Sequence, residues 1–440
     1  MMNGDATFVA PATPFGTSGI AVVRINGPLA LTILSKMSRG IKPKPRTATL
    51  TKIYNQDGKL IDECIVTFFK SPASYTGDDL LEVSCHGNPV LVNNIIQTVC
   101  TNGARLAEPG EFTKKAFING KIDLLQAEAV GALIKSRSDA AAKINSQTLN
   151  GTLSHSLNNL NNELINVASK IEHAIDIAES EIQNSFYKSC NSEIKTIIHS
   201  TEQILLTFEA GKMLNDGIRV VITGKPNVGK STLINYFSGS EKAIVSDIPG
   251  TTRDIVESTM NIGGVPVRFI DTAGIHSTDD KIEKIGIERA SAEIGFADLV
   301  LYIFDDPSQD IFPEFGCPFI CILNKSDLHK NVSKNDSIIH ISAKSGKNVE
   351  FLLDKIKETM SINEVSTDTP HLTSNHQQIA ISKSLESQQA ASKLLDHTSP
   401  EMELVAYELR DAISAIDTLL GKTSPDDILN NIFKNLCVGK

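Results

Sequence analysis

A glycine-rich turn between an apolar run and an amphipathic run constrains the fold of this chain more than any other feature. The turn reads GKPNVGKST from Gly224 to Thr232; the β-branched run Arg219–Thr223 precedes it and LINYF follows it. Between a strand and a helix, such a turn directs backbone N–H groups at phosphate oxygens, and Lys230 supplies a cation. The hydroxyl of Ser231 suits Mg²⁺. The sequence therefore predicts a P-loop in an α/β domain, with phosphate contacts from Asn227, Val228, Gly229, Lys230, Ser231 and Thr232.

Three later motifs each follow an apolar strand, in an order and spacing that resemble translation-factor-like GTPases. DTAG follows Val267–Ile270, NKSD follows Phe319–Leu323, and SAK follows Ile338–Ile341. The candidate contacts from these motifs are Asp271, Thr272, Ala273, Gly274, Asn324, Lys325, Asp327, Ser342, Ala343 and Lys344. Asp327 can accept both the ring N–H and the exocyclic amine of guanine, a donor pair that adenine lacks. The set predicts a Ras-like G domain that prefers GTP to ATP.

The segment SDIPGTTRD, between the first two motifs, is the predicted first switch. Its candidate nucleotide contacts are Ser246, Asp247, Ile248, Pro249, Gly250, Thr251 and Thr252. Thr252 is the candidate to reach Mg²⁺ only when the γ-phosphate is present. Many GTPases place a water-orienting Gln directly after the glycine of DTAG, but this chain has Ile275 there. Glu283 is the nearest candidate for that catalytic role, beside Lys230 and Thr252.

Helical sequence lies on both sides of this α/β segment. Apolar residues recur at steps of three and four from Leu153 to Ala178, and a second stripe comprises Leu404, Val405, Leu409, Ile413, Ile416 and Leu420. The first part of the chain instead carries the β-type runs Ile20–Ile25, Cys64–Phe69 and Leu80–Cys85, with one helical run at Val90–Thr101. We expect an α+β domain at 1–118, a helical domain in two parts at 119–215 and 366–440, and the α/β domain inserted at 216–365. The polar stretch Glu364–Gln378 is the expected returning linker.

Length, composition and charge exclude several classes of protein. The 440 residues are 41% hydrophobic, which suits two or three globular domains and excludes a disordered chain. A net charge of −10 means that any RNA contact is local or supplied by a partner. No apolar run approaches the roughly 20 residues of a membrane span, and the N-terminal residues resemble no targeting segment, so we expect a cytoplasmic protein with no membrane contact. The seven scattered cysteines suit free thiols in a reducing compartment.

Beyond the four GTPase motifs, long segments resemble the tRNA-modifying GTPase family MnmE, also called TrmE. They are ATPFGTSGIAVVRING near the start, SYTGDDLLEVSCHGNP at Ser74–Pro89, EPGEFTKKAFINGKIDLLQAEA at Glu108–Ala129, DIPGTTRD, and the terminal FKNLCVGK. The resemblance covers essentially the whole chain. A generic GTPase would share neither the first blocks nor the last.

This resemblance implies a multidomain α+β and α/β protein: an N-terminal folate-binding-like domain that forms a homodimer, a helical domain, and a G domain inserted in it. It implies GTP hydrolysis, activated by K⁺ and dependent on Mg²⁺. It further implies a heterotetramer with the flavoprotein MnmG (GidA), which builds an aminomethyl or carboxymethylaminomethyl group on the wobble uridine of tRNA. The one-carbon source in the family is a tetrahydrofolate derivative, 5-formyl- or 5,10-methylene-tetrahydrofolate.

The resemblance also implies roles for particular residues. Its folate contacts fall on Arg24, Glu82, Lys121 and Lys440. Its K⁺ ligands fall on Asn227, Ser246, Ile248 and Thr251, and its Mg²⁺ ligands on Ser231 and Thr252. Glu283 falls on the water-positioning acid, and Cys437 on the family's terminal cysteine. His86, near the folate residues, is interpreted as a hydrogen-bonded structural histidine.

Two other classes compete with an enzyme component. A ribosome-assembly GTPase would carry a basic RNA-binding appendage in place of the folate-like domain, and no such appendage is visible in this sequence. A scaffold would use GTP hydrolysis only to report assembly, and no general base for uridine chemistry is identifiable that would separate it from an enzyme component. The choice of tRNAs, the use of ammonia or glycine, and the extent of G-domain movement are likewise open.

Overall fold

The computed structural model describes residues 6–175, 183–240, 257–271, 293–306, 308, 312–328, 338–362, 369–397, 399–423, 429, 432–434 and 436–439. The chain forms two compact units. The first combines residues 1–134, 148–200 and 380–440, and the second combines residues 135–147 and 201–379. The four-part division expected from the sequence stays a prediction.

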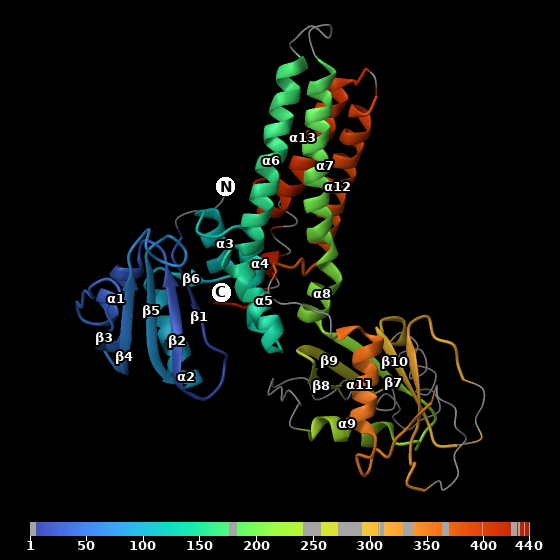
Figure 1. Ribbon diagram of the computed structural model, residues 1–440. Helices are drawn as coiled ribbons and strands as arrows, with labels where there is room; N and C mark the ends of the chain where they lie inside the picture. The colour runs from blue at the N-terminus through green and yellow to red at the C-terminus, as the bar shows by residue number, and fades with distance from the viewer. Residues whose placement is uncertain are drawn as a thin grey trace, which may run out of the picture. The chain divides into compact units, whose positions relative to one another are not determined.

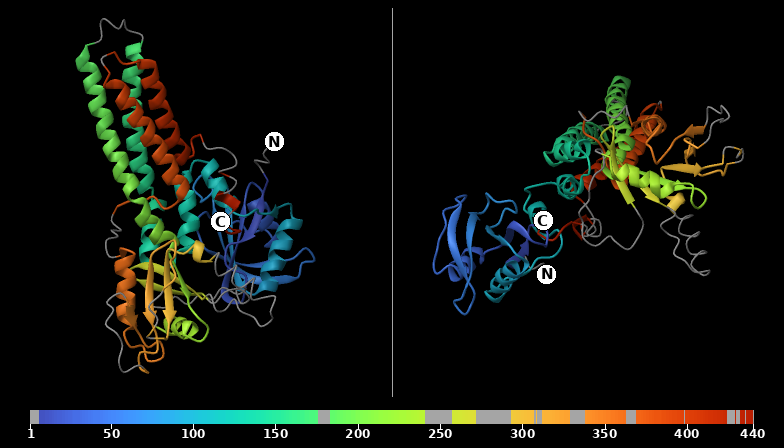
Figure 2. Two further views of the ribbon diagram at one scale, coloured as in Figure 1. Left: turned by 90° about the vertical axis from the view of Figure 1, so that its right-hand side faces the viewer. Right: turned by 90° about the horizontal axis from the view of Figure 1, so that it is seen from below.

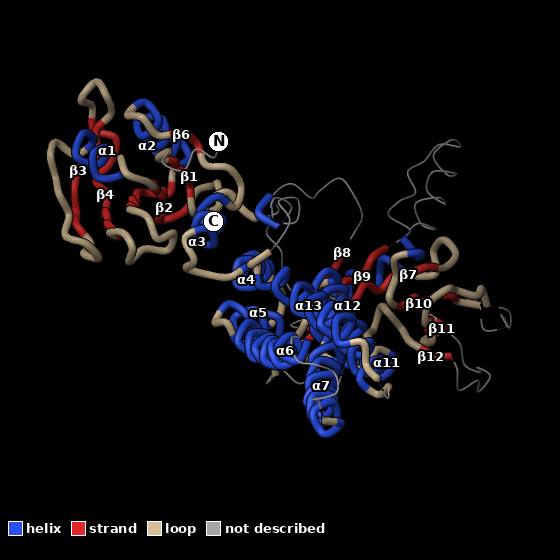
Figure 3. Tube along the Cα trace, turned by 90° about the horizontal axis from the view of Figure 1, so that it is seen from above, coloured by secondary structure: helices blue, strands red, loops and turns tan. Residues whose placement is uncertain are grey.

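The first unit contains a six-stranded sheet in the order β3-β4-β5-β2-β1-β6. The strands are β1 (Phe8–Pro11), β2 (Ser18–Asn26), β3 (Thr49–Tyr54), β4 (Leu60–Phe69), β5 (Leu80–Gly87) and β6 (Arg105–Leu106). All neighbours are antiparallel except β1 and β6. Helices α1 (Ala30–Met37) and α2 (Pro89–Thr101) cover one face (Figure 3). There Ile33 and Ile95 share a buried core with Val23 and Val83.

The three predicted β-type runs and the predicted helix of this region are confirmed. Each observed strand extends further than its prediction, and α2 begins at Pro89, one residue before the predicted start. Asn88 caps that helix because its side chain accepts a 2.8 Å hydrogen bond from the Val90 N–H. The sequence analysis did not identify β1, β3 or α1.

Four long helices of the first unit run side by side in Figure 1 and in the left view of Figure 2. They are α6 (Thr152–Ile175), α7 (Asn184–Leu206), α12 (Asn375–Leu395) and α13 (Met402–Leu420). The predicted stripe on α6 is confirmed from Leu153 to Ile171, all of whose members are buried. The prediction for Ile175 is wrong, because this side chain at the end of the helix is 37% exposed, and Ala178 lies outside the described residues. The prediction for Leu404 on α13 is wrong, because this side chain is 45% exposed. The buried face of α13 begins one residue later, at Val405, and includes Ala406 and Ala412.

The end of the chain returns to the first helices of the same unit. These are α3 (Glu111–Ile118) and α4 (Leu124–Lys135). Phe433 and Leu436 are buried against Leu124 and Phe117. The N–H of Gly110 donates a 3.3 Å hydrogen bond to the carbonyl of Cys437, whose side chain is exposed. These contacts tie the last residues to the N-terminal part of the unit.

The second unit contains a six-stranded sheet in the order β12-β11-β10-β7-β9-β8. Figure 1 labels β7, β8, β9 and β10 of this sheet. The strands are β7 (Ile218–Thr223), β8 (Glu257–Ile262), β9 (Val265–Asp271), β10 (Leu299–Phe304), β11 (Phe319–Leu323) and β12 (Ile338–His340). Only β8 runs antiparallel to its neighbour. The four strands that the motifs required, β7, β9, β11 and β12, are confirmed.

Helices of this unit bury one face of the sheet. They are α5 (Asp139–Leu149), α8 (Phe208–Asp216), α9 (Lys230–Ser238) and α11 (Val349–Thr359). Phe237 and Leu352 enter the core from α9 and α11. Ile144 of α5 is buried in the same core, although the sequence assigned it to the helical domain.

Two further observations concern the linker and the membrane. The predicted linker Glu364–Gln378 is wrong at its end, because α12 already begins at Asn375, while residues 363–368 lie outside the described part. Within the described chain, no helix combines the length and apolar composition that crossing a bilayer requires.

Candidate functional site

The carboxyl ends of four parallel strands gather the predicted motifs at one edge of the second sheet. The P-loop follows β7, Asp271 ends β9, Asp305 follows β10 and Asn324 follows β11. Strand β7 lies between β9 and β10, at the centre of the sheet. Open parallel sheets bind ligands outside the carboxyl ends of their strands. The topology therefore assembles one site from segments that lie far apart in the sequence.

The backbone of the P-loop depends on two glycines. Gly224 has φ +145°, and a Cβ there would collide with the carbonyl oxygen of Ile303. Gly229 has φ +102°, and a Cβ there would collide with the amide nitrogen of Asn324. Residues that carry a side chain rarely adopt such φ values, and a Cβ would also collide with its neighbour, so glycine is required at both positions. The loop is thereby packed directly against β10 and the start of NKSD.

Lys230 lies inside this loop. Its side chain is buried, and Nζ donates hydrogen bonds to the carbonyls of Gly224 at 2.8 Å and Lys225 at 2.9 Å. Burial lowers the pKa of the Lys230 ammonium, and the charge of Asp271 opposes this shift. A buried cation held among carbonyls is suited to meet an incoming anion.

Ser231 and Asp271 bring two oxygen ligands together. The hydroxyl of Ser231 donates a 2.8 Å hydrogen bond to Oδ2 of Asp271, and the Asp271 side chain is buried. A hydroxyl and a carboxylate at this spacing suit Mg²⁺, which binds through one or two carboxylates together with phosphate oxygens. The first and second motifs thus meet as the sequence predicted.

Asn324 joins the third motif to the first and the fourth. Its side-chain N–H donates a 2.8 Å hydrogen bond to the carbonyl of Val228, and its Oδ1 accepts a 2.9 Å hydrogen bond from the N–H of Ala343. Both bonds are buried. This one side chain therefore connects the P-loop, NKSD and SAK.

Lys325 has a partner that the sequence analysis missed. Its Nζ lies 2.6 Å from Oδ2 of Asp305 and donates a 2.9 Å hydrogen bond to the carbonyl of Asn227. Asp305 directly follows a fully buried strand, at the edge where the motifs meet. That position after an apolar run is the sequence signal that could have identified it.

The remaining predicted contacts fall into two groups. In the described part, Asp327, Lys344 and Thr232 are exposed, whereas Ser342 and Ala343 are buried. The predicted residues outside the described part are Ser246, Asp247, Ile248, Pro249, Gly250, Thr251, Thr252, Thr272, Ala273, Gly274, Glu283 and Lys440.

Two of the predicted folate residues contact each other in the first unit. Arg24 on β2 and Glu82 on β5 face each other across the sheet, and Arg24 Nε lies 2.9 Å from Glu82 Oε1. Arg24 also donates a 3.2 Å hydrogen bond to the carbonyl of Gly439. The carboxylate is thus held by a cation, and the chain end reaches the same place.

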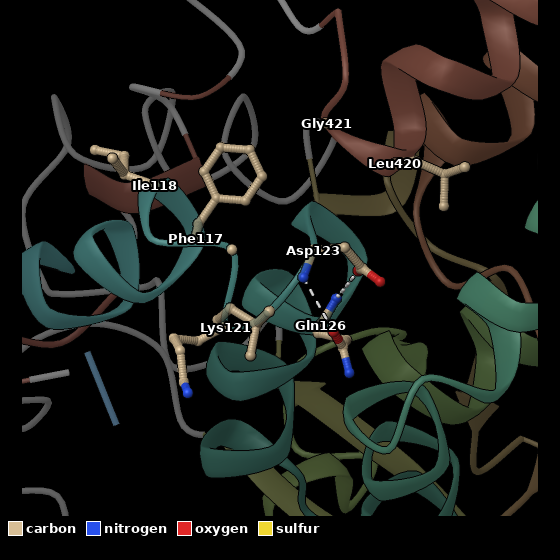
Figure 4. Close-up of a pocket in the computed structure, with 9 residues that line it drawn as sticks. Phe117, Ile118, Lys121, Asp123, Gln126, Leu420 and Gly421 are labelled. Carbon is tan, nitrogen blue, oxygen red and sulfur yellow. Dashed lines mark hydrogen bonds between the residues drawn. The ribbon is translucent and has the colours of Figure 1, made fainter. Parts of the chain in front are cut away.

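Lys121 lies elsewhere in that unit. Its Nζ donates a 3.1 Å hydrogen bond to the carbonyl of Pro72, and the residue lines a cavity of about 580 Å³ (Figure 4). Phe117, Asp123 and Leu420 also line this cavity, whereas Arg24 and Glu82 do not. Asp123 and Gln126 exchange hydrogen bonds of 2.9 and 3.0 Å at the start of α4, as Figure 4 shows.

The interpretation of His86 as a hydrogen-bonded histidine is confirmed. The ring nitrogen Nδ1 of His86 lies 2.8 Å from Oδ1 of Asp62, and the backbone N–H of His86 donates a 2.9 Å hydrogen bond to Oδ2 of Asp62. Burial alone would raise the pKa of Asp62, but the hydrogen bonds from the backbone and ring of His86 outweigh it and lower the pKa. The pair holds β4 and β5 together at their ends.

Solved structures with similar parts include two G domains of FeoB proteins. The G domain of the T. maritima FeoB iron transporter is 25% identical, with 32% of this chain and 98% of that chain covered and a TM-score of 0.24. The Methanococcus jannaschii FeoB G-domain is 22% identical, with 33% of this chain and 98% of that chain covered and a TM-score of 0.25. These TM-scores support no conclusion about fold.

Family and whole-chain comparisons agree with each other. The family "GTP-binding protein TrmE N-terminus" matches residues 7–121, and "MnmE helical domain" matches residues 124–437. The protein named tRNA modification GTPase MnmE from Clostridioides difficile is 35% identical, with 99% of each chain covered. Its namesakes from Acetivibrio thermocellus and Aquifex aeolicus are 37% and 36% identical, with 98% or more of each chain covered. The chain therefore belongs to the MnmE (TrmE) family of tRNA modification GTPases.

Proposed function

We propose that this chain hydrolyses GTP as a component of an enzyme that modifies the wobble uridine of tRNA. The observation that carries the proposal is the convergence of the P-loop, Asp271 and Asn324 at one sheet edge, in a chain that matches tRNA modification GTPases over its whole length. The product is a uridine carrying an aminomethyl or carboxymethylaminomethyl group.

In the proposed site, each motif binds a different part of MgGTP. The P-loop amides and Lys230 hold the β and γ phosphates, whose oxygens replace the Gly224 and Lys225 carbonyls around the Lys230 ammonium. Ser231, with Asp271 beside it and Thr252 from the first switch, holds Mg²⁺, which would neutralise charge on the phosphates. Asp327 binds the guanine edge, while Lys325 and SAK border the base.

The chain lacks the glutamine that orients the attacking water in many GTPases, so other groups must take this role in hydrolysis. We assign the water-positioning role to Glu283, since Ile275 occupies the usual Gln position. Asn227, Ser246, Ile248 and Thr251 supply the oxygens for a K⁺ ion, whose charge would stabilise the transition state. The exposed Asn227, at φ +64°, lies on the outer side of the P-loop and is accessible to such an ion.

Arg24 and Glu82, with Lys121 and Lys440, are the proposed contacts of the tetrahydrofolate derivative. A carboxylate can grip the amidine-like edge of a pterin twice, and the glutamyl tail requires cations. Because Arg24 already pairs with Glu82, the pterin would share that carboxylate with the guanidinium or displace it. The Gly439 carbonyl at Arg24 would bring Lys440 to the same ligand.

The proposed assembly is a cytoplasmic homodimer that joins the flavoprotein MnmG (GidA) in a heterotetramer acting on tRNA. The observation in its support is the similarity over the whole chain, from the N-terminal domain to the last residues.

Two measurements test the proposal. The purified chain should release phosphate from GTP and not from ATP. Nucleoside mass spectrometry of tRNA from a strain lacking the gene should show loss of the modified wobble uridine, and the Lys230→Ala chain should fail to restore it. Unchanged nucleosides in that strain would reject the tRNA-modifying role, and equal hydrolysis of ATP would reject the base assignment.

A further inference from the structure

Positive charge is strongly segregated in the N-terminal part of the chain. Residues 6–56 contain seven Lys and Arg and no Asp or Glu, although the whole chain carries a net charge of −10. Six of the seven lie between Lys36 and Lys52, here called the basic segment: Lys36, Arg39, Lys42, Lys44, Arg46 and Lys52. Such a run in an acidic protein is a local electrostatic feature, not a reflection of composition.

The structure presents all six cations to solvent. The basic segment covers the last turn of α1, the following loop and the edge strand β3, whose outer side has no neighbouring strand. Each of the six residues is exposed, and within the described residues none forms an ion pair with a carboxylate. Pairing with internal carboxylates therefore does not account for the clustering of these cations.

The loop that carries these cations is held in one conformation. Its core reads Lys42-Pro43-Lys44-Pro45-Arg46, in which Pro43 is buried and the three cations are exposed. Proline fixes its own φ and keeps the preceding residue extended, so successive cations are spaced along a stiff segment. The Arg46 N–H donates a 2.7 Å hydrogen bond to the Phe68 carbonyl. A polyanion can bind such a surface with little loss of conformational entropy.

An arginine at each end of the loop is also anchored. The Arg39 guanidinium lies 3.9 Å from the centre of the Tyr54 ring, and Arg46 Nη2 donates a 2.8 Å hydrogen bond to the Ala73 carbonyl. Guanidinium groups held in this way keep further N–H donors for phosphate oxygens. The surface thus combines two arginines that are held in place by neighbouring residues with lysines that are exposed to solvent.

We propose that the basic segment binds the phosphate backbone of the tRNA substrate. This inference rests on the proposed function, which supplies a polyanion as the ligand. Phosphate contacts from Lys and Arg give affinity without sequence information, so this surface would position the tRNA and would not select its bases. The remainder of an acidic chain repels RNA, so this surface also orients the docked tRNA.

The acidic groups beside the surface define its extent. Glu63, on β4, is exposed directly opposite Lys52, and Asp57 lies in the turn that follows β3. No acidic residue occurs in sequence between Lys36 and Arg46. The RNA contact is therefore centred on the loop. Lys42 and Lys44 are its test positions, because within the described residues neither side chain forms a hydrogen bond or ion pair, and the 3.2 Å hydrogen bond from the Thr47 N–H to the Lys44 backbone carbonyl is kept in the variant.

The experiment compares binding of fluorescent tRNA to the full-length chain and to the variant Lys42→Gln/Lys44→Gln over a KCl series. The variant should bind at least about fivefold more weakly at 0.1 M salt. The slope of log affinity against log salt should fall in magnitude by about 1.4–1.8, since each lost phosphate contact removes about 0.7–0.9. GTP turnover should be unchanged, which reports an intact fold.

The matched control is Lys188→Gln/Lys383→Gln, which removes the same charge from exposed positions on α7 and α12. It should keep the full salt slope, and equal losses in both variants would overturn the inference in favour of a net-charge effect. Unchanged binding of the test variant, no tRNA binding by the unaltered chain, or binding of this surface only to phosphatidylglycerol vesicles would also overturn it. None of these results would alter the nucleoside analysis, which decides the proposed function separately.

Discussion

The ammonium of Lys325 lies 2.6 Å from the carboxylate of Asp305, which joins the NKSD motif to the end of the neighbouring strand β10. The same ammonium donates to the Asn227 carbonyl in the P-loop. Asp305 thereby orients a side chain that itself contacts two parts of the site. Because both partners are 36–37% exposed, the ion pair contributes modestly, about 0.2–1 kcal/mol.

We predict that Asp305→Asn weakens GTP binding by about two- to fivefold, since Lys325 loses the charge that holds it. Preference for GTP over xanthosine triphosphate should stay the same, because the guanine edge is read by Asp327. Fluorescent-nucleotide titration measures both. Asp354→Asn is the matched control, since it breaks an ion pair with Lys357 within α11 and removes the same charge. Equal effects of the two substitutions would contradict a positioning role for Asp305.

Asp327→Asn should lower GTP affinity by at least about a hundredfold, because a bidentate hydrogen-bond partner is lost in a polar site. The same variant should gain affinity for xanthosine triphosphate, whose C2 carbonyl oxygen can accept a hydrogen bond from the Asn amide where guanine carries its exocyclic amine. Competition titration with the two nucleotides gives the ratio. A variant that keeps its GTP preference would show that Asp327 does not read the base.

The lowered pKa of Lys230 predicts how GTP binding responds to alkaline pH. Phosphate binds the charged ammonium, so the affinity of the free protein for GTP should fall as pH rises through that lowered pKa. Lys230→Arg keeps its charge at all accessible pH values and should not show this decline, even if it binds more weakly. Titration of guanine itself affects both proteins alike. Parallel pH profiles would therefore refute the role of the Lys230 proton.

A bound K⁺ ion is expected to replace the arginine finger in hydrolysis. A finger contributes roughly 10³–10⁵ in turnover, so K⁺ should raise GTP turnover by at least about tenfold over Na⁺, which is too small for the oxygen cage. Asn227→Ala should lose this response. Glu283→Ala should lower turnover with little change in GTP affinity, as expected for a contact made only in the transition state.

Arg253 is the rival to the ion, because it lies beside Thr252 in the first switch segment. Phosphate release measured in KCl and NaCl separates the two mechanisms. A full K⁺ response in Asn227→Ala together with an inactive Arg253→Ala would assign catalysis to an arginine finger.

Arg24→Ala and Glu82→Ala should each abolish binding of 5-formyltetrahydrofolate and leave GTP affinity unchanged, since separate sites have additive effects. Calorimetric titration measures both ligands. Glu193→Ala is the matched control, because it breaks the exposed pair between Glu193 on α7 and Lys170 on α6, and this variant should bind folate normally. Normal folate binding by both test variants would move the pocket away from the Arg24–Glu82 pair, and the cavity beside Lys121 would become the next candidate.

Local patterns were sufficient for much of the fold. The stripe from Leu153 to Ile171 needed only helical periodicity, because one face of α6 is buried along its length. On α13 the same reasoning misplaced Leu404. Three consecutive residues, Leu404, Val405 and Ala406, are apolar or small, and only the contact with the facing helix selects which of them are buried. Edge strand β3 escaped prediction because its alternation of exposed Leu50 and Lys52 lacks a clear apolar face.

The sequence by itself determined the chemistry of the nucleotide motifs, because their residue types and spacing follow from the geometry of phosphate and guanine. Only the tertiary structure decided that Asp305 meets Lys325, that Ile144 is buried beneath the second sheet, and that the chain end reaches Arg24. Each of these contacts joins segments whose pairing depends on strand order and on packing between distant elements. Short-range patterns carry no information about such pairings, since the free energy that selects them comes from burying the whole core at once.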